Sequence, residues 1–110
     1  MSSMYIRTKN NIYKVESTLR DSGFIKGYNV GKMGFIIKDQ VITQSENLEE
    51  LCDEFVVMDK ETKEVMNIVY FLEYAKLWDT CKYNIYGSVW CEWGLKYVAK
   101  LDDKGELELT

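Results

Sequence analysis

The side chains best suited to chemistry in this 110-residue chain are three thiols, Cys52, Cys81 and Cys91. Their odd number and the absence of a CxxC spacing argue against a disulfide framework or a zinc knuckle. Because the sequence has no histidine, carboxylates would have to complete any tetrahedral site at Cys81 and Cys91, and we expect both thiols to be free of metal. In LEELCDEF, Cys52 follows the spacing of a buried helix face, which favours a packing role.

Groups that catalyse reactions are sparse. No Ser or Cys lies beside an evident base, and no glycine-rich phosphate loop follows a strand into a helix. Paired carboxylates occur at Glu49-Glu50 and Asp102-Asp103, but the first pair is expected on a solvated helix face and the second in a turn. The sequence therefore favours a protein that is not an enzyme and that needs no cofactor.

The composition indicates a folded protein, because 46% of the residues are hydrophobic and 14% are aromatic, against 29% charged. The length is that of one ordinary domain, so we expect a single globular domain over residues 1–110. No apolar run approaches the roughly 18 residues that cross a bilayer, and the start MSSMYIRTKN lacks the apolar segment of a signal peptide. We therefore expect a soluble cytoplasmic protein without a membrane partner.

Charge is distributed unevenly along the chain. Residues 1–40 contain seven Lys/Arg and three Asp/Glu, whereas residues 41–110 contain seven and fifteen, so the two parts carry +4 and −8. An excess of acid disfavours direct binding to nucleic acid, which requires clustered cations, and favours a protein partner with a basic surface. The alternative is that most of these charges only solvate the exposed faces of an acidic protein.

The first 45 residues are expected to be rich in strands. In MYIRTKNNIYKV, a two-residue turn at Asn10-Asn11 predicts a hairpin in which Ile6 pairs with Val15. After a turn at residues 21–23, GFIKGYNV and GFIIKDQVIT are predicted to be short strands separated by GKMG.

The stretch SENLEELCDEF predicts the clearest helix, over residues 47–55. Ser45 or Asn47 would cap its first amides, and Glu50 follows Asn47 by three residues, close to a capping box. The outer face of this helix would present four carboxylates, which we predict to bind a basic partner: Glu49, Glu50, Asp53 and Glu54.

The following segment, KEVMNIVYFLEYAKLWDT, is apolar on nearly every side and is compatible with a buried helix. We favour a strand that ends at Phe71, paired with FVVMD, and then a short helix to about Asp79.

The C-terminal residues predict a three-stranded meander. Three-residue loops at residues 92–94 and 103–105 would pair Cys91 with Leu95 and Leu101 with Leu107, with a glycine at the left-handed position of each loop. The side chains expected to face the core are Val89, Cys91, Leu95, Tyr97, Ala99, Leu101, Leu107 and Leu109. The predicted fold class is therefore α+β, a mostly antiparallel sheet with one or two short helices and this meander at the C-terminus.

Three aromatic residues, Tyr86, Trp90 and Trp93, fall outside that core row. Tryptophan and tyrosine dominate the energetics of protein interfaces, so we predict that these residues contact a partner. The alternative is that another layer of the fold covers them.

Several short motifs carry a resemblance to known proteins: IRTKN near the start, LEELCDEFV in the middle, and YG-x-x-W followed by GLKYVAK and KGELEL at the end. They resemble a family of small, mostly uncharacterised proteins encoded by phages and prophages of Firmicutes. The resemblance covers both ends and the centre but not residues 59–82. It implies a setting, the cytoplasm of a Gram-positive host, and no catalytic residues.

Two functions follow from these expectations. The first is that of an anti-CRISPR-type inhibitor, which would block a basic host nuclease such as a Cas effector by stoichiometric association. The second is that of a phage structural or accessory protein, which would self-associate through a β edge or its aromatic face. In either case we expect a monomer or a small homo-oligomer.

Overall fold

A computed structural model of the chain describes residues 3–18, 26–31, 34–70 and 72–110. Its strands are β1 (Met4–Arg7), β2 (Ile12–Val15), β3 (Ser17–Thr18), β4 (Gly27–Asn29), β5 (Phe35–Ile37), β6 (Thr43–Ser45), β7 (Glu54–Asp59), β8 (Val65–Val69), β9 (Tyr83–Cys91), β10 (Gly94–Leu101) and β11 (Leu107–Leu109). The helical elements are α1 (Leu72–Lys76) and the 3-10 turns η2 (Lys38–Gln40) and η3 (Leu48–Glu50). All described strand pairs are antiparallel. The prediction of a mostly antiparallel protein with few, short helices is therefore confirmed.

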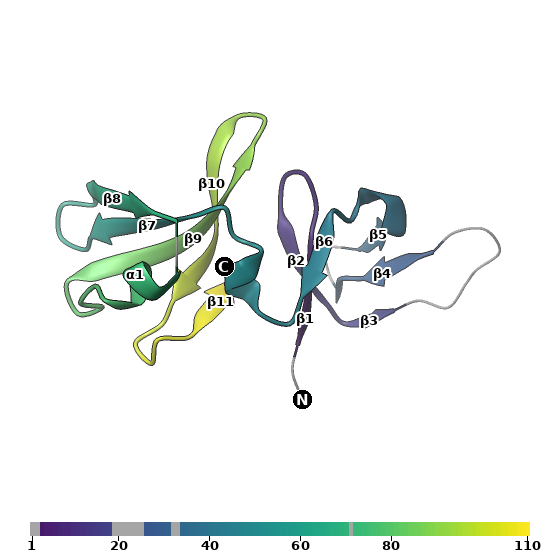
Figure 1. Ribbon diagram of the computed structural model, residues 1–110, viewed down its shortest axis with the longest axis horizontal. Coiled ribbons are helices and arrows are strands. Elements are labelled where there is room, and N and C mark those ends of the chain that lie inside the picture. The colour runs from purple at the N-terminus through teal and green to yellow at the C-terminus, as the bar shows by residue number, and fades with distance from the viewer. Residues whose placement is uncertain (1–2, 19–25, 32–33, 71) are drawn as a thin grey trace.

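The strands form three sheets, with the orders β2-β1-β6, β3-β4-β5 and β11-β10-β9-β7-β8 (Figure 1). In the five-stranded sheet, β7 lies between β8 and β9. Its central residues, FVVM, form a continuous apolar run, and the adjacent side chains Val56 and Val57 are both 0% exposed although they point to opposite faces. Such a run is typical of a strand that is buried on both sides.

One face of the five-stranded sheet, which we call the packed face, carries the hydrophobic core. The helix α1 packs against one end of this face, and η3 and β2 pack against the other end. The buried members of the two clusters are Phe55, Val57, Ala75, Ile85 and Leu101 in the first, and Ile12, Leu48, Leu51, Val89, Val98 and Ala99 in the second.

The opposite face of the same sheet is called the open face. From the strand register its members include Glu54, Val56, Ile68, Tyr86, Ser88, Trp90, Leu95, Tyr97 and Lys100. Neither hydrophobic cluster of the described residues includes a member of this face. Its exposed members include Ile68, Trp90 and Tyr97, at 40%, 52% and 36%, whereas Val56 and Ser88 are 0% exposed.

The sheets β2-β1-β6 and β3-β4-β5 form the other half of an elongated molecule, whose extents are 51 × 33 × 22 Å (Figure 1). Arg7, at the end of β1, joins the two halves. Its guanidinium donates to the Asp53 carboxylate at 3.0 Å and to the carbonyl of Leu51 at 3.4 Å. The same Asp53 oxygen accepts the Trp90 amide of β9 at 2.7 Å, so a single carboxylate connects β1 to β9.

The predicted helix over residues 47–55 is wrong, because only η3 forms and the chain enters β7 at Glu54. Ser45 Oγ and Asn47 Nδ2 do donate to the Glu50 carboxylate, at 2.7 and 3.3 Å, but the Asn47 side chain caps no backbone amide. The β-branched run that follows pairs on both sides with neighbouring strands. This pairing competes with helix extension and ends the helix after one turn.

The N-terminal hairpin forms with a different register from the predicted one. Ile6 pairs with Tyr13 instead of Val15, because the Thr8 amide donates to the Asn11 carbonyl at 2.9 Å and closes a four-residue loop. The shift is two residues, so each side chain keeps its predicted face. The short strands β4 and β5 lie within the predicted segments, whereas the predicted turn at residues 21–23 lies outside the described residues.

The C-terminal strands β9, β10 and β11 form a meander that agrees with the prediction only in part. Leu101 pairs with Leu107 as expected, and Gly105 has a φ of 82°. In the first hairpin, however, Gly94 pairs with Cys91, and a bulge lies between Tyr97 and Ala99. The extra residue, Val98, is 4% exposed, whereas Leu95 and Tyr97, both predicted to face the core, lie on the open face opposite Trp90 and Ser88.

The segment after β7 follows the favoured prediction, a strand and then a short helix. β8 ends at Val69 and α1 spans Leu72–Lys76, while Phe71 lies outside the described residues. The alternative of one long buried helix is wrong. Within the described ranges, no helix has the length and apolarity that crossing a membrane requires.

Candidate functional site

The open face presents aromatic rings to solvent. Tyr86 of β9 and Tyr97 of β10 stack with their ring centroids 5.0 Å apart and an interplanar angle of 13°. Trp90 lies one side-chain position beyond Ser88 on the same strand face, and Ile68 of β8 extends the apolar surface across β7. Exposed apolar and aromatic side chains gathered on one face are typical of a surface that binds another macromolecule.

Trp93 lies apart from this face, at the tip of the β9–β10 loop, and is 86% exposed. The next residue towards β9, Glu92, forms an ion pair with Lys9 at 2.5 Å, which ties the tip to the β1–β2 loop. The hydrogen bond and charge of Lys9 hold the pKa of Glu92 below its ordinary value. An ion pair this exposed contributes little to stability, so its consequence is to position the loop that carries Trp93.

The four carboxylates predicted to share one outer face do not do so, because the helix that would align them is absent. Glu49 is half-buried, Glu50 is exposed, Asp53 is bound to Arg7 and Trp90, and Glu54 is 6% exposed. Hydrogen bonds from Ser45 and Asn47 lower the pKa of Glu50. Of the predicted acidic surface, Glu50 alone among the four remains an exposed carboxylate free of a cationic partner.

Glu54 is the exceptional member of this group. By register it lies directly opposite Ser88, on the open face, and the Ser88 hydroxyl donates to its backbone carbonyl at 2.7 Å. Its side-chain oxygen Oε2 is buried and has no hydrogen-bond partner among the described residues. A buried carboxylate oxygen without a donor is energetically unfavourable and uncommon in folded proteins.

Of the three thiols, that of Cys52 is placed for packing rather than reaction. Cys52 contacts both hydrophobic clusters, and burial raises the pKa of its thiol to about 12. Cys91 is half-buried with its Sγ 3.2 Å from the Gly94 carbonyl, and Cys81 is exposed. Because the thiolate is the reactive form, Cys52 is unsuited to nucleophilic or metal chemistry at neutral pH.

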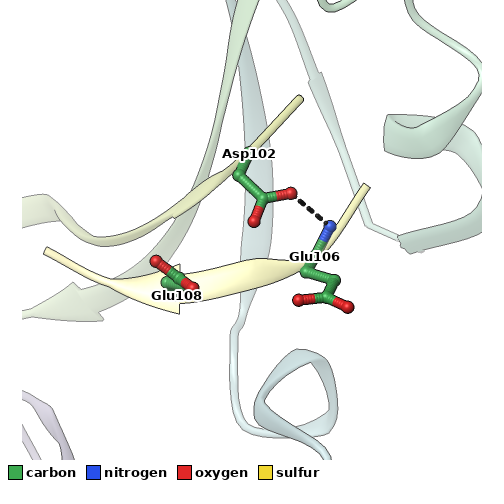
Figure 2. Close-up of side chains that lie close together, drawn as sticks. All are labelled: Asp102, Glu106 and Glu108. Carbon is green, nitrogen blue, oxygen red and sulfur yellow. Dashed lines mark hydrogen bonds between the residues drawn. The ribbon is translucent and has the colours of Figure 1, made fainter. Parts of the chain in front are cut away.

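One group of carboxylates in the described chain has the spacing of a metal site: Asp102, Glu106 and Glu108 at the β10–β11 turn, with oxygens within 4.8 Å of one another (Figure 2). Asp102 already accepts the backbone amides of Lys104 and Glu106, at 2.9 and 2.8 Å. The carboxylate thus closes the turn, and the two glutamates are exposed. Oxygen ligands of this type would suit a hard cation such as Ca²⁺ or Mg²⁺.

Two features of the site were not apparent in the sequence. Tyr97 reaches the open face only because of the bulge at Val98, which no local sequence signal marks. The burial of Glu54 depends on the chain entering β7 one residue before the apolar run, a position where the sequence pattern predicted a helix.

Comparison with known proteins assigns no family to this geometry: no family model, no curated protein and no solved structure matches the chain.

Proposed function

We propose that the chain is a non-enzymatic binding protein that associates stoichiometrically with another protein. The observation that carries this proposal is the open face, on which Trp90, Tyr97 and Ile68 remain exposed beside the Tyr86–Tyr97 stack. Rings of this kind supply large apolar area at a small cost in conformational entropy, and they dominate binding hot spots. The exposed Trp93 at the neighbouring loop tip adds a second anchor.

The partner we propose is a protein with a basic surface. Aromatic rings on a sheet also bind single-stranded nucleic acid, but such surfaces combine the rings with a groove of cations. Here residues 41–110, which contain all the rings of the open face, carry a net charge of −8 (seven Lys/Arg against fifteen Asp/Glu). This balance favours opposing Lys and Arg side chains over phosphates.

The resemblance of IRTKN, LEELCDEFV and GLKYVAK to small phage proteins supplies a setting for this activity, the cytoplasm of a bacterial host. In that setting the proposed function is that of an anti-CRISPR-type inhibitor. The chain would occupy a basic, nucleic-acid-handling surface of a host nuclease such as a Cas effector and so prevent cleavage without modifying the nuclease.

The test measures whether the chain inhibits a nuclease and whether a variant without the two exposed tryptophans loses this inhibition. The purified chain is titrated into the DNA-cleavage reaction of a Cas effector from a Gram-positive host, beside the variant Trp90→Ala/Trp93→Ala. We expect cleavage to fall to zero near one chain per nuclease, and the variant to be at least tenfold weaker. A chain that binds no effector of this kind, or that inhibits equally well without both tryptophans, contradicts the proposal.

Self-association is the second candidate, and one observation favours it. β8 lies at the end of the five-stranded sheet, and its residues Val65, Met66 and Ile68 are 50%, 51% and 40% exposed. An apolar edge strand is a template for pairing with another copy. Sedimentation velocity across a concentration series tests this: a dimer that Met66→Lys disrupts, with no inhibition of a nuclease, would favour the structural or accessory function.

A further inference from the structure

The buried Glu54 carboxylate on the open face has no donor within the described part of the protein. The residue is 6% exposed, and its Oε2 has no hydrogen-bond partner. Arg7, the cation that binds the preceding residue Asp53, donates to Thr8, Leu51 and Asp53. Removing a carboxylate from water without a donor costs several kcal/mol in general, so this position favours the arrival of an external donor.

The surroundings of Glu54 indicate which donor fits. Ser88 lies directly across from it, and Tyr86 and Trp90 occupy the two positions beside Ser88 on the same face. A carboxylate flanked by aromatic rings combines a negative charge with π faces. A guanidinium matches both, because it stacks on aromatic rings and donates in a planar fork to a carboxylate.

We propose that the open face receives an arginine side chain of the partner protein, which stacks on the Trp90 and Tyr86 rings and donates hydrogen bonds to the Glu54 carboxylate. This inference rests on the proposed function, which it deepens by naming the group that the partner inserts. Because Oε2 is covered in the unbound protein, the docking arginine displaces the covering side chains. Trp90, which is 52% exposed, has room to change its rotamer.

The probe for this site is N-acetyl-arginine amide, with N-acetyl-citrulline amide as the uncharged isostere. Each is titrated into the ¹⁵N-labelled protein, and the indole N–H of Trp90 is followed after its signal has been assigned by its absence in Trp90→Phe. We expect saturable shifts at Trp90 and Ser88 with the arginine derivative, and at least tenfold weaker binding of the citrulline derivative. Equal shifts with both derivatives, or no shift with arginine, overturn the proposal.

Two variants test which carboxylate binds the arginine side chain. Glu54→Gln keeps the shape of the side chain and should weaken arginine binding about tenfold, whereas Glu50→Gln, at an exposed carboxylate outside the sheet, should leave it unchanged. If Glu54→Gln fails to fold in circular dichroism, the wild-type comparison of arginine with citrulline still decides the question. Equal weakening by both variants would indicate general electrostatics and would overturn the assignment to Glu54.

The outcome is separable from that of the proposed function. If the wild-type chain inhibits the nuclease and Glu54→Gln inhibits it equally strongly, the binding function is supported and the arginine site is wrong. If arginine binds as described but no nuclease is inhibited, the site stands and the identity of the partner is wrong. A dimer that is lost in Trp90→Ala would assign the open face to a second copy and would overturn the arginine proposal.

Discussion

The packed face and the open face of the five-stranded sheet are made from alternate residues of the same strands, yet they differ in chemistry. On the packed face, Phe55, Ile85 and Val89 are at most 1% exposed under α1, η3 and β2. On the open face, Trp90 and Tyr97 remain in contact with water. The difference indicates that stability depends on the buried packed face, and we propose that the exposed aromatic rings of the open face serve recognition.

The largest expected effect separates the two faces directly. Phe55→Ala removes a 1% exposed ring from the packed face and should lower the free energy of unfolding by about 4 kcal/mol. Trp90→Ala, on the open face, should lower it by less than about 1 kcal/mol. Urea unfolding followed by circular dichroism measures both. Equal losses in the two variants would refute the division of labour between the faces.

A methyl group added to the packed face tests how closely it is packed. In Gly87→Ala, the new Cβ would lie 2.8 Å from Cys52 Sγ and 3.3 Å from Ala99 Cβ. We expect a loss of about 2 kcal/mol in the free energy of unfolding, because Cys52 and the sheet must move apart. Adding Cys52→Ala should recover at least half of that loss. If the double variant is no more stable than Gly87→Ala, contact with Cys52 is not the cause.

The Arg7–Asp53–Trp90 link between the two halves should contribute less to the free energy of unfolding than the core does. Asp53→Ala leaves the Arg7 guanidinium, 8% exposed as a residue, without its carboxylate and removes the acceptor of the Trp90 amide. We expect a loss of about 2 kcal/mol in unfolding free energy, measured in urea. Asp103→Ala, at an exposed turn residue, is the matched control and should change stability by less than about 0.5 kcal/mol. A similar value for both aspartates would show that the link is not stabilising.

The smallest effect concerns Glu50, the exposed counterpart of the buried Glu54. Its pKa should lie below the ordinary 4.5 because Ser45 and Asn47 donate to the carboxylate, and Ser45→Ala should raise it. The ionised form therefore adds a small stability above the unfolded pKa, and this is lost as pH falls through the lower folded pKa. A ¹³C NMR titration measures the shift, and an unchanged pKa in Ser45→Ala would contradict the assigned cause.

The elements that the sequence predicts well are those whose signals are local. The loop glycine Gly105 fixes the register of the β10–β11 hairpin, and the β-branched residues before Val69 identify β8 despite its apolar surroundings. The helix predicted at residues 47–55 does not form beyond η3. Local hydrogen bonds such as that from Ser45 to Glu50 are present, but they stabilise a helix less than sheet pairing stabilises the following apolar run as a strand.

The candidate site is less predictable from sequence for the same reason. Trp90 and Trp93 are exposed as expected from their place outside the predicted core row. The alternation of side chains predicts Tyr97 in the core, but a single bulge residue, Val98, reverses this alternation in the structure. No sequence signal near Val98 indicates the bulge. Glu54 was assigned to a solvated face, because its burial depends on contacts across the sheet from Ser88.

The Arg7–Asp53–Trp90 link also bears on the order in which the chain folds. Arg7 and Asp53 are 46 residues apart, and the Lys9–Glu92 pair at the hairpin tips spans 83 residues. Contacts this distant in sequence close late, because the entropy of a long loop is lost before they form. Since the Asp53 carboxylate is held by the Trp90 amide, we expect β7 and β9 to pair first and the N-terminal hairpin to dock afterwards. In stopped-flow refolding, Arg7→Ala, which leaves the hydrogen bond between Asp53 and the Trp90 amide in place, would then accelerate unfolding and leave the folding rate nearly unchanged.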